Sequence, residues 1–106
     1  MSNESLLNAE LLVEKLSTLG AITSKRMFGG HGIFYNAKMF AMVDSKGVCY
    51  FKVDDRLQKE FAQLGSKPNA RMPYASIPKG VFNDLDQLHN WAQKSIAYML
   101  VKTTKK

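Results

Sequence analysis

Hydrophobic side chains recur every three or four residues in three segments of the chain, the spacing of one face of an α-helix. The first segment covers residues 5–19, and Gly20 provides a stop signal after it. The second covers residues 55–64, where the carboxylate of Asp54 or Asp55 suits a helix start. The third follows a capping Asn83 or Asp84 and carries one apolar face made of Leu85, Leu88, Ala92, Ile96 and Met99. The pattern predicts three helices.

Between the first two helices the pattern changes to short β-rich runs separated by turn residues. It predicts strands over residues 22–28, 32–35, 38–44 and 48–53. Hairpin turns are predicted at Asn36-Ala37 and at residues 45–47. Because the Cβ of Ala37 disfavours the positive φ of a tight two-residue turn, a longer or type I turn is the alternative there. Another strand is predicted near residues 71–77, where Pro73 restricts it to an edge or a bulge.

The resulting order of elements is α-β-β-β-β-α-β-α. It predicts an α+β fold in which helices pack on an antiparallel sheet of about four to five strands. No internal repeat, low-complexity tract or long linker divides the sequence. We therefore expect residues 1–106 to form one domain, which at this length can bury a core without disulfides or metals.

The predicted strand over residues 38–44 is apolar on both faces. Strict alternation gives one set of side chains made of Met39, Ala41 and Val43, and an opposite set made of Phe40 and Met42. Residues 48–53 repeat the pattern. Either helices of this chain cover both faces, or one face is a surface for a dimer or another partner, because large apolar patches rarely face water.

The charge of the chain leaves nucleic acid open as a partner. Fifteen lysines and arginines against nine acidic residues give a net charge of +6, which favours encounters with polyanions. The positive residues are dispersed, and the candidate nucleic-acid contacts are Lys25, Arg26, Lys38 and Lys52. The longest apolar runs are far below the roughly 20 residues that cross a bilayer, and the N-terminus lacks a secretion signal. We expect no membrane partner and a cytoplasmic protein.

The sequence contains no recognised catalytic or metal-binding motif. His31 and His89 lack neighbours at metal-ligand spacing, and no activated nucleophile accompanies His31, which we place at a tight turn between two glycines. Cys49 lies in an apolar run, where free cysteine is commonly a small buried hydrophobe. The aspartates stand at turns or helix starts, where capping explains them. We predict no catalytic residue, no cofactor and no metal ligand.

The glycine-rich run over residues 27–32 is a poor phosphate loop. It lacks the Gly-Lys-Ser/Thr ending and leads into a strand, without the helix N-terminus that would hold an anion. Glycines at such strand junctions more often permit a bulge or a close approach of helix and sheet.

Several segments resemble the TfoX (Sxy) family N-terminal domain. The strongest is Lys25-Arg26-Met27-Phe28-Gly29-Gly30-His31-Gly32-Ile33-Phe34, followed by the runs at residues 39–43, 50–54, 74–78 and 88–92. The positions that carry this resemblance, as structural or interaction residues, are Arg26, Met27, Phe28, Gly29, Gly30, Gly32, Phe40, Tyr74, Pro78 and Trp91.

The resemblance implies an α+β fold without enzymatic activity. It also implies a bacterial regulator of natural competence, and so of DNA transformation, that promotes transcription with the cyclic-AMP receptor protein. Two departures are Asn36-Ala37, in place of a glycine-containing turn, and a short region at residues 68–71 without an aromatic pattern common there. These regulators commonly carry a second, C-terminal domain; we expect none within residues 1–106, as in a stand-alone relative or a shortened two-domain regulator.

Three classes of function remain for comparison. The first is a protein-interaction module of a transcriptional regulator, with the cyclic-AMP receptor protein or the transcription machinery as partner and a homodimer as an alternative. The second is direct nucleic-acid binding through the dispersed lysines and arginines. An enzyme is the third, and no set of residues supports it.

Overall fold

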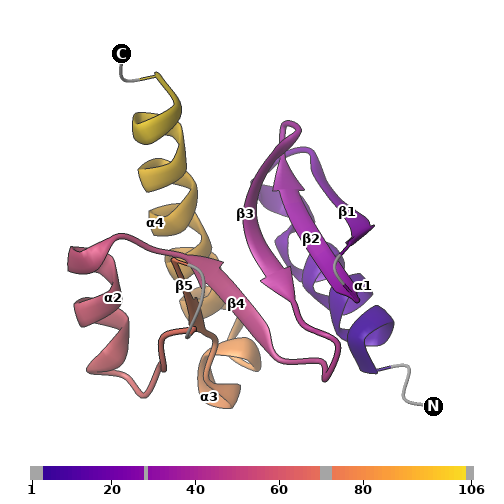
Figure 1. The fold of residues 1–106 in the computed structure, drawn as a ribbon, viewed down its shortest axis with the longest axis horizontal. Coiled ribbons are helices and arrows are strands. Elements are labelled where there is room, and N and C mark those ends of the chain that lie inside the picture. The colour runs from indigo at the N-terminus through magenta and orange to yellow at the C-terminus, as the bar shows by residue number, and fades with distance from the viewer. Residues whose placement is uncertain (1–3, 28, 70–72, 105–106) are drawn as a thin grey trace.

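Five antiparallel strands form one sheet in which neighbours along the chain are also neighbours in space (Figure 1). The computed structural model describes residues 4–27, 29–69 and 73–104. The strands are β1 (Ile22–Met27), β2 (Gly30–Tyr35), β3 (Lys38–Val43), β4 (Cys49–Lys52) and β5 (Tyr74–Ser76). This meander confirms the predicted α+β class and its antiparallel sheet.

The helices also follow the predicted order. They are α1 (Glu4–Leu16), continued by a 3-10 turn over Ser17–Leu19, then α2 (Asp55–Ala62), α3 (Lys79–Phe82) and α4 (Leu85–Thr104). The sequence pattern did not predict the short helix α3, because the proline and glycine of Pro78-Lys79-Gly80 are typical of a loop. Pro78 instead has the extended φ and ψ angles of an N-cap residue.

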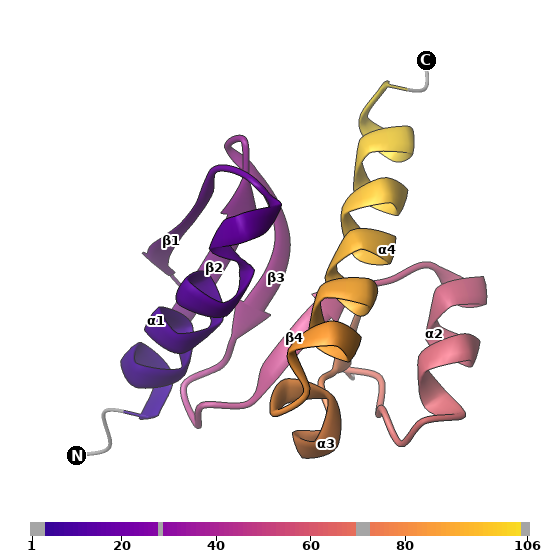
Figure 2. The same cartoon turned by 180° about the vertical axis from the view of Figure 1, so that it is seen from behind.

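The two long helices pack on the same face of the sheet. Helix α1 contacts β1, β2 and β3, whereas α4 contacts β3 and β4, and the two helices also contact each other. Seen from behind, both helices lie in front of the strands (Figure 2). The core between these layers contains fully buried Leu12, Ile33, Phe40, Phe51 and Leu88. Burial of apolar surface contributes about 25 cal/mol for each Å² removed from water, so this core is the main source of stability.

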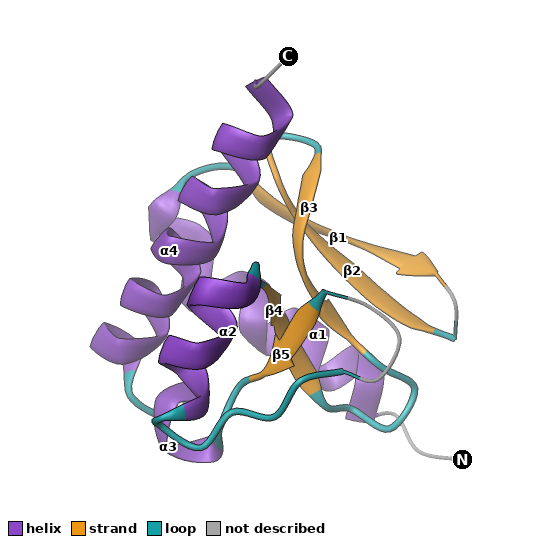
Figure 3. Ribbon diagram, turned by 60° about the vertical axis from the view of Figure 1, so that its left-hand side comes forward, coloured by secondary structure: helices purple, strands orange, loops and turns teal. Residues whose placement is uncertain are grey.

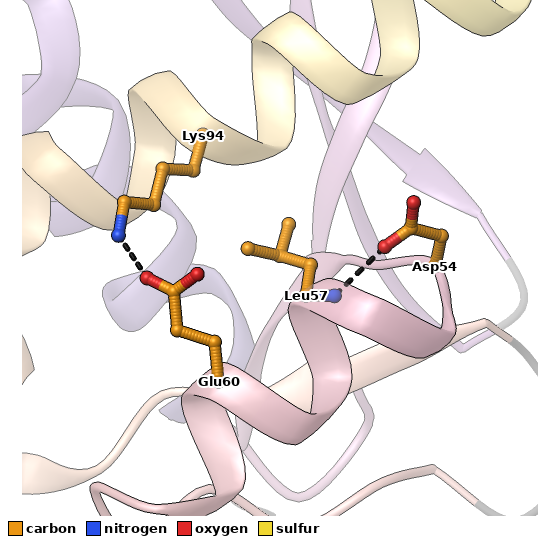
Figure 4. A network of polar contacts seen from close by, with 4 residues as sticks. All are labelled: Asp54, Leu57, Glu60 and Lys94. Atoms are coloured by element: carbon orange, nitrogen blue, oxygen red, sulfur yellow. Dashed lines mark hydrogen bonds and ion pairs between the residues drawn. The ribbon is translucent and has the colours of Figure 1, made fainter.

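Helix α2 lies beside α4, to one side of β1–β3 (Figure 3). The rings of Phe61 and Trp91 stack with centroids 3.9 Å apart. The carboxylate of Asp54 accepts a hydrogen bond of 2.8 Å from the backbone N–H of Leu57, which caps α2, and Lys94 on α4 forms an ion pair with Glu60 (Figure 4). Asp54 is thus the residue that caps α2, one of the two candidates from the sequence. The ring stack and the ion pair hold α2 to α4, away from β1–β3.

The first hairpin is tighter than the alternative turn considered from the sequence. Tyr35 pairs with Lys38, so Asn36 and Ala37 alone form the turn. Both have positive φ, 50° and 71° respectively, as a type I′ turn requires. The turn at residues 45–47 is confirmed, with the Asp44 carboxylate accepting from the N–H groups of Lys46 and Val48.

Candidate interaction surface

The face of β1–β3 opposite α1 and α4 is covered by none of the helices in the described part of the chain. In Figure 1 this face points toward the viewer, with β2 and β3 in front. The strand register places Met27, Phe34, Met39 and Met42 together on it, each half-buried. We call this side of strands β1–β4 the open face, because β4 continues it with Tyr50 and Lys52. Of the two alternatives for the two-sided strands, the described helices therefore cover one side of β1–β3 and leave the other uncovered.

A register shift in β3 decides which side chains reach the open face. Ile33 pairs with Ala41 and Phe34 with Met39, so the pairing passes over Phe40. This irregularity turns Phe40 into the core, where its ring stacks on that of Phe51 at 6.2 Å. The predicted sets of residues 38–44 are therefore wrong at two positions. Phe40 joins Ala41 and Val43 on the covered side, whereas Met39 joins Met42 on the open face, because a bulge breaks strict alternation.

Gly32 lies at the centre of the open face. A Cβ placed on Gly32 would lie 3.1 Å from the sulfur atoms of both Met27 and Met39 and 3.1 Å from the ring of Phe34. These three side chains therefore lean over the glycine from β1, β2 and β3. The absent side chain lets long, apolar groups pack against each other, which explains why they are half-buried although none of the described helices lies above them.

Lysines flank the methionine cluster on two sides. Lys25 on β1 pairs with Gly32, and Lys52 on β4 pairs with Tyr74, so both lie on the open face. Tyr50 lies between Met42 and Ser76 in the same row. Its hydroxyl donates to Asp44 over 3.4 Å, and burial, followed by the negative charge of Asp44, raises the pKa of Tyr50.

The four candidate nucleic-acid contacts are split between the two faces. Lys25 and Lys52 lie on the open face. Arg26 pairs with His31 on the covered side of the sheet, where the arginine is exposed at the edge. Lys38 pairs with Tyr35, whose ring packs against the core. The structure therefore does not bring these four side chains into one basic patch.

Most residues of the family motif serve the fold. Gly29 has φ of 77° at the β1–β2 turn, and a Cβ on Gly30 would lie 2.1 Å from the carbonyl oxygen of Val43. The glycine run thus allows a close approach between strands. Tyr74 and Trp91 are buried. Phe28 and the predicted strand start at residue 71 lie outside the described residues.

Both histidines make contacts that join α1 to other elements. His31 lies within β2, not at the tight turn expected from the sequence, and its Nδ1 is 3.0 Å from the hydroxyl of Ser5 on α1. His89 on α4 donates from Nε2 to the carbonyl of Lys15 over 2.6 Å. Both imidazoles therefore help to fix α1.

Cys49 is a buried hydrophobe, as predicted. It is 7% exposed and lines a pocket of about 550 Å³ between α1, the β3–β4 turn and α3. Burial, and secondarily the charge of Asp44, raises the pKa of the thiol to about 12. The thiol is therefore protonated at neutral pH and a poor nucleophile.

The residues that the structure describes contain neither a metal-binding cluster nor a membrane-spanning helix. Their His, Cys, Asp and Glu side chains form no group of three that could hold a metal ion. Among the same residues, no helix is both long enough and apolar enough to cross a membrane.

The fold and the surface define an α+β domain whose antiparallel sheet has one helix-covered face and one open, methionine-rich face. The TfoX N-terminal domain family model matches residues 14–99, which is most of the chain. The protein belongs to the TfoX N-terminal domain family. A search of curated proteins found no match.

Proposed function

We propose that the protein is a non-enzymatic interaction module of a cytoplasmic regulator of natural competence and transcription, and that it binds its protein partner through the open face. The observation that carries this proposal is the cluster of Met27, Phe34, Met39 and Met42 on a face that none of the described helices covers. Antiparallel sheets with one solvated face usually alternate apolar and polar residues. Here apolar residues occupy the solvated side as well, which is characteristic of a binding surface.

Methionine suits such a surface for a physical reason. Its unbranched side chain has several rotatable bonds and a polarisable sulfur, so it adapts to partners of different shape. Three methionines from β1 and β3 lie around Gly32, so the surface can rearrange without moving the backbone. Family membership supports the cyclic-AMP receptor protein, or RNA polymerase, as the partner to test first.

Binding to purified cyclic-AMP receptor protein and RNA polymerase, measured by biolayer interferometry, tests the proposal. Met42→Lys places a charge within the cluster, and we expect it to weaken binding to the true partner at least tenfold, the size of a typical hot-spot loss. Leu64→Lys is the matched control, since Leu64 is 56% exposed after α2 and acquires the same charge. Failure of both proteins to bind, or equal binding by both variants, would contradict the proposal.

Direct nucleic-acid binding is the second candidate, favoured by one observation. Lys25, Lys52 and the aromatic rings of Phe34 and Tyr50 lie on the same face, an arrangement that can stack bases and contact phosphates. Fluorescence anisotropy with single-stranded and double-stranded DNA, at low and physiological salt, tests it. Binding should weaken steeply with salt and be lost in Lys25→Glu/Lys52→Glu; no binding at low salt eliminates this function.

A further inference from the structure

We propose that the occupant of the open face is an acidic, amphipathic helix of the partner protein. This inference rests on the proposed function and names the chemistry of the partner. Three features of the face carry it: the pairing of its strands, the methionine cluster over Gly32, and the two flanking lysines.

The strand pairing requires an occupant that satisfies its own backbone. Strands β2 and β3 are each paired on both sides within the sheet, so their N–H and C=O groups already have partners. A segment lying flat on this face gains no ladder of main-chain hydrogen bonds. Because an unpaired buried backbone group is destabilising, the segment must pair its own groups, and a helix does so within one element.

The methionine cluster matches the apolar stripe of such a helix. Met27 and Met39 lean over Gly32 from opposite neighbouring strands, and Phe34 lies against the same point. Receptors of amphipathic helices use adaptable apolar surfaces of this kind, and the helix contributes anchors at positions i, i+3 or i+4, and i+7. A bound helix would add a second helical layer and enclose the sheet on both faces.

The charges on the face select an acidic helix. Among the described strand residues on this face, the charged side chains are Lys25 on β1 and Lys52 on β4. Strands β1 and β4 are separated by three inter-strand spacings, about 14 Å in total. A helix of about nine or ten residues has the same length. Carboxylates at the two ends of a short apolar stripe would meet both lysines. The nearby carboxylate of Asp44 is instead engaged by the N–H groups of its own turn.

The same lysines disfavour a second copy of this chain as the occupant. A symmetric dimer places the same patch on both subunits, so two open faces in contact would bring four lysines together. Like charges across an interface oppose association. The alternative homodimer through this face therefore lacks the charge complementarity that an acidic helix has.

The test uses two synthetic peptides and methionine methyl NMR signals of the whole chain. Both peptides have the same apolar stripe on a helix of about 14 residues, and they differ only in carrying glutamates or lysines on the remaining positions. We expect the acidic peptide to shift the methyl signals of Met27, Met39 and Met42. The signal of Met99, which is 3% exposed within α4, should stay unchanged and serves as the internal control.

Charge reversal provides the matched variants. Lys25→Glu/Lys52→Glu should weaken acidic-peptide binding at least tenfold and transfer the preference to the basic peptide. Lys59→Glu/Lys67→Glu changes the net charge equally at exposed lysines outside the open face and should bind like the unmodified chain. If the double variant loses the circular dichroism of the folded protein, the single variant Lys25→Glu, at an exposed position, replaces it. This single variant should also weaken binding of the acidic peptide.

Each other outcome overturns the inference. Equal shifts with both peptides would remove the role of charge, and shifts with a single-stranded oligonucleotide but not with the acidic peptide would make nucleic acid the occupant. Shifts with no probe would also reject the inference. The proposed function is judged separately: if the regulators bind in a Met42-dependent manner while the acidic peptide does not, the function stands and only its partner chemistry fails.

Discussion

Ser95 on α4 contacts the backbone carbonyl of Phe40, the residue that the β2–β3 pairing passes over. The hydroxyl oxygen of Ser95 is 3.1 Å from this carbonyl oxygen and 2.7 Å from that of Lys52 on β4. Ser95 is fully buried. One polar side chain of the helix therefore lies between β3 and β4 at the irregularity that creates the open face, and it couples the covered side of the sheet to the geometry of the surface.

Replacing Ser95 by alanine should lower the free energy of unfolding by about 2 kcal/mol, because buried carbonyls lose the donor that approaches them. A hydroxyl has one proton, so it donates to one carbonyl at a time. Urea unfolding with an unchanged m-value measures the loss. Ser17→Ala removes a surface hydroxyl that donates to the backbone carbonyl of Glu14 and should change stability by less than about 0.5 kcal/mol. Equal effects of the two variants would contradict the coupling.

Gly30→Ala should be the most damaging glycine substitution in the sheet. Its Cβ would lie 2.1 Å from the carbonyl oxygen of Val43 and 3.0 Å from the Cα of Asp44. Backbone atoms cannot rotate away, so β2 and β3 must separate, and we expect a loss of about 3 kcal/mol. Gly80→Ala in α3 is the control, since nothing lies within 4 Å of its Cβ. It should gain about 0.5 kcal/mol in chemical unfolding.

Much of the fold could be predicted from the sequence because local chemistry determines it. The helical periodicity of α4 and the capping carboxylate of Asp54 depend on neighbouring residues, and so does the turn at residues 45–47. Helix α3 was missed because four residues carry too little periodicity to be recognised. Its Pro78-Lys79-Gly80 start has the composition of a loop.

The candidate surface was only partly predictable. Two apolar faces in residues 38–44 left two alternatives, helices of this chain on both sides or a partner surface on one, but the sequence could not show that the pairing passes over Phe40. Such an irregularity depends on how β2 meets β3, and it reverses the facing of Met39. Lys25 and Lys52 were identified as candidates, whereas their separation from Arg26 and Lys38 required the register.

Alkaline pH should destabilise the protein through two buried groups. Burial raises the pKa of Tyr74 to about 12 from an ordinary 10.0, and burial with the charge of Asp44 raises that of Cys49 to about 12 from 9.0. The folded state therefore keeps protons that the unfolded chain releases. The stability that they contribute is fully present below about pH 9 and is lost as pH rises toward about 12.

Thermal melts at pH 8, 9, 10 and 11 measure this decline. Tyr74→Phe and Cys49→Ala each remove one titrating group, so we expect a shallower decline than in the unmodified chain, whatever their constant effect on packing. The difference between each variant and the unmodified chain at pH 8 provides the reference. A decline of equal slope in all three proteins would assign the alkaline loss to other groups.

Ala37→Gly should stabilise the protein, although glycine usually destabilises. Ala37 adopts φ of 71° in the turn between β2 and β3, where the Cβ of an L-residue crowds its own backbone at a cost of about 1 kcal/mol. Removing that Cβ relieves the strain, and a gain of about 1 kcal/mol corresponds to about 5 °C in melting temperature. Asn36, with φ of 50°, tolerates this region better, so Asn36→Gly should gain less.

Ala97→Gly, at an exposed position of α4, should instead lose about 1 kcal/mol, because glycine is unfavourable in a helix interior. Differential scanning calorimetry of the three variants distinguishes turn strain from a general effect of glycine, and a lower melting temperature for Ala37→Gly would show that the turn is not strained.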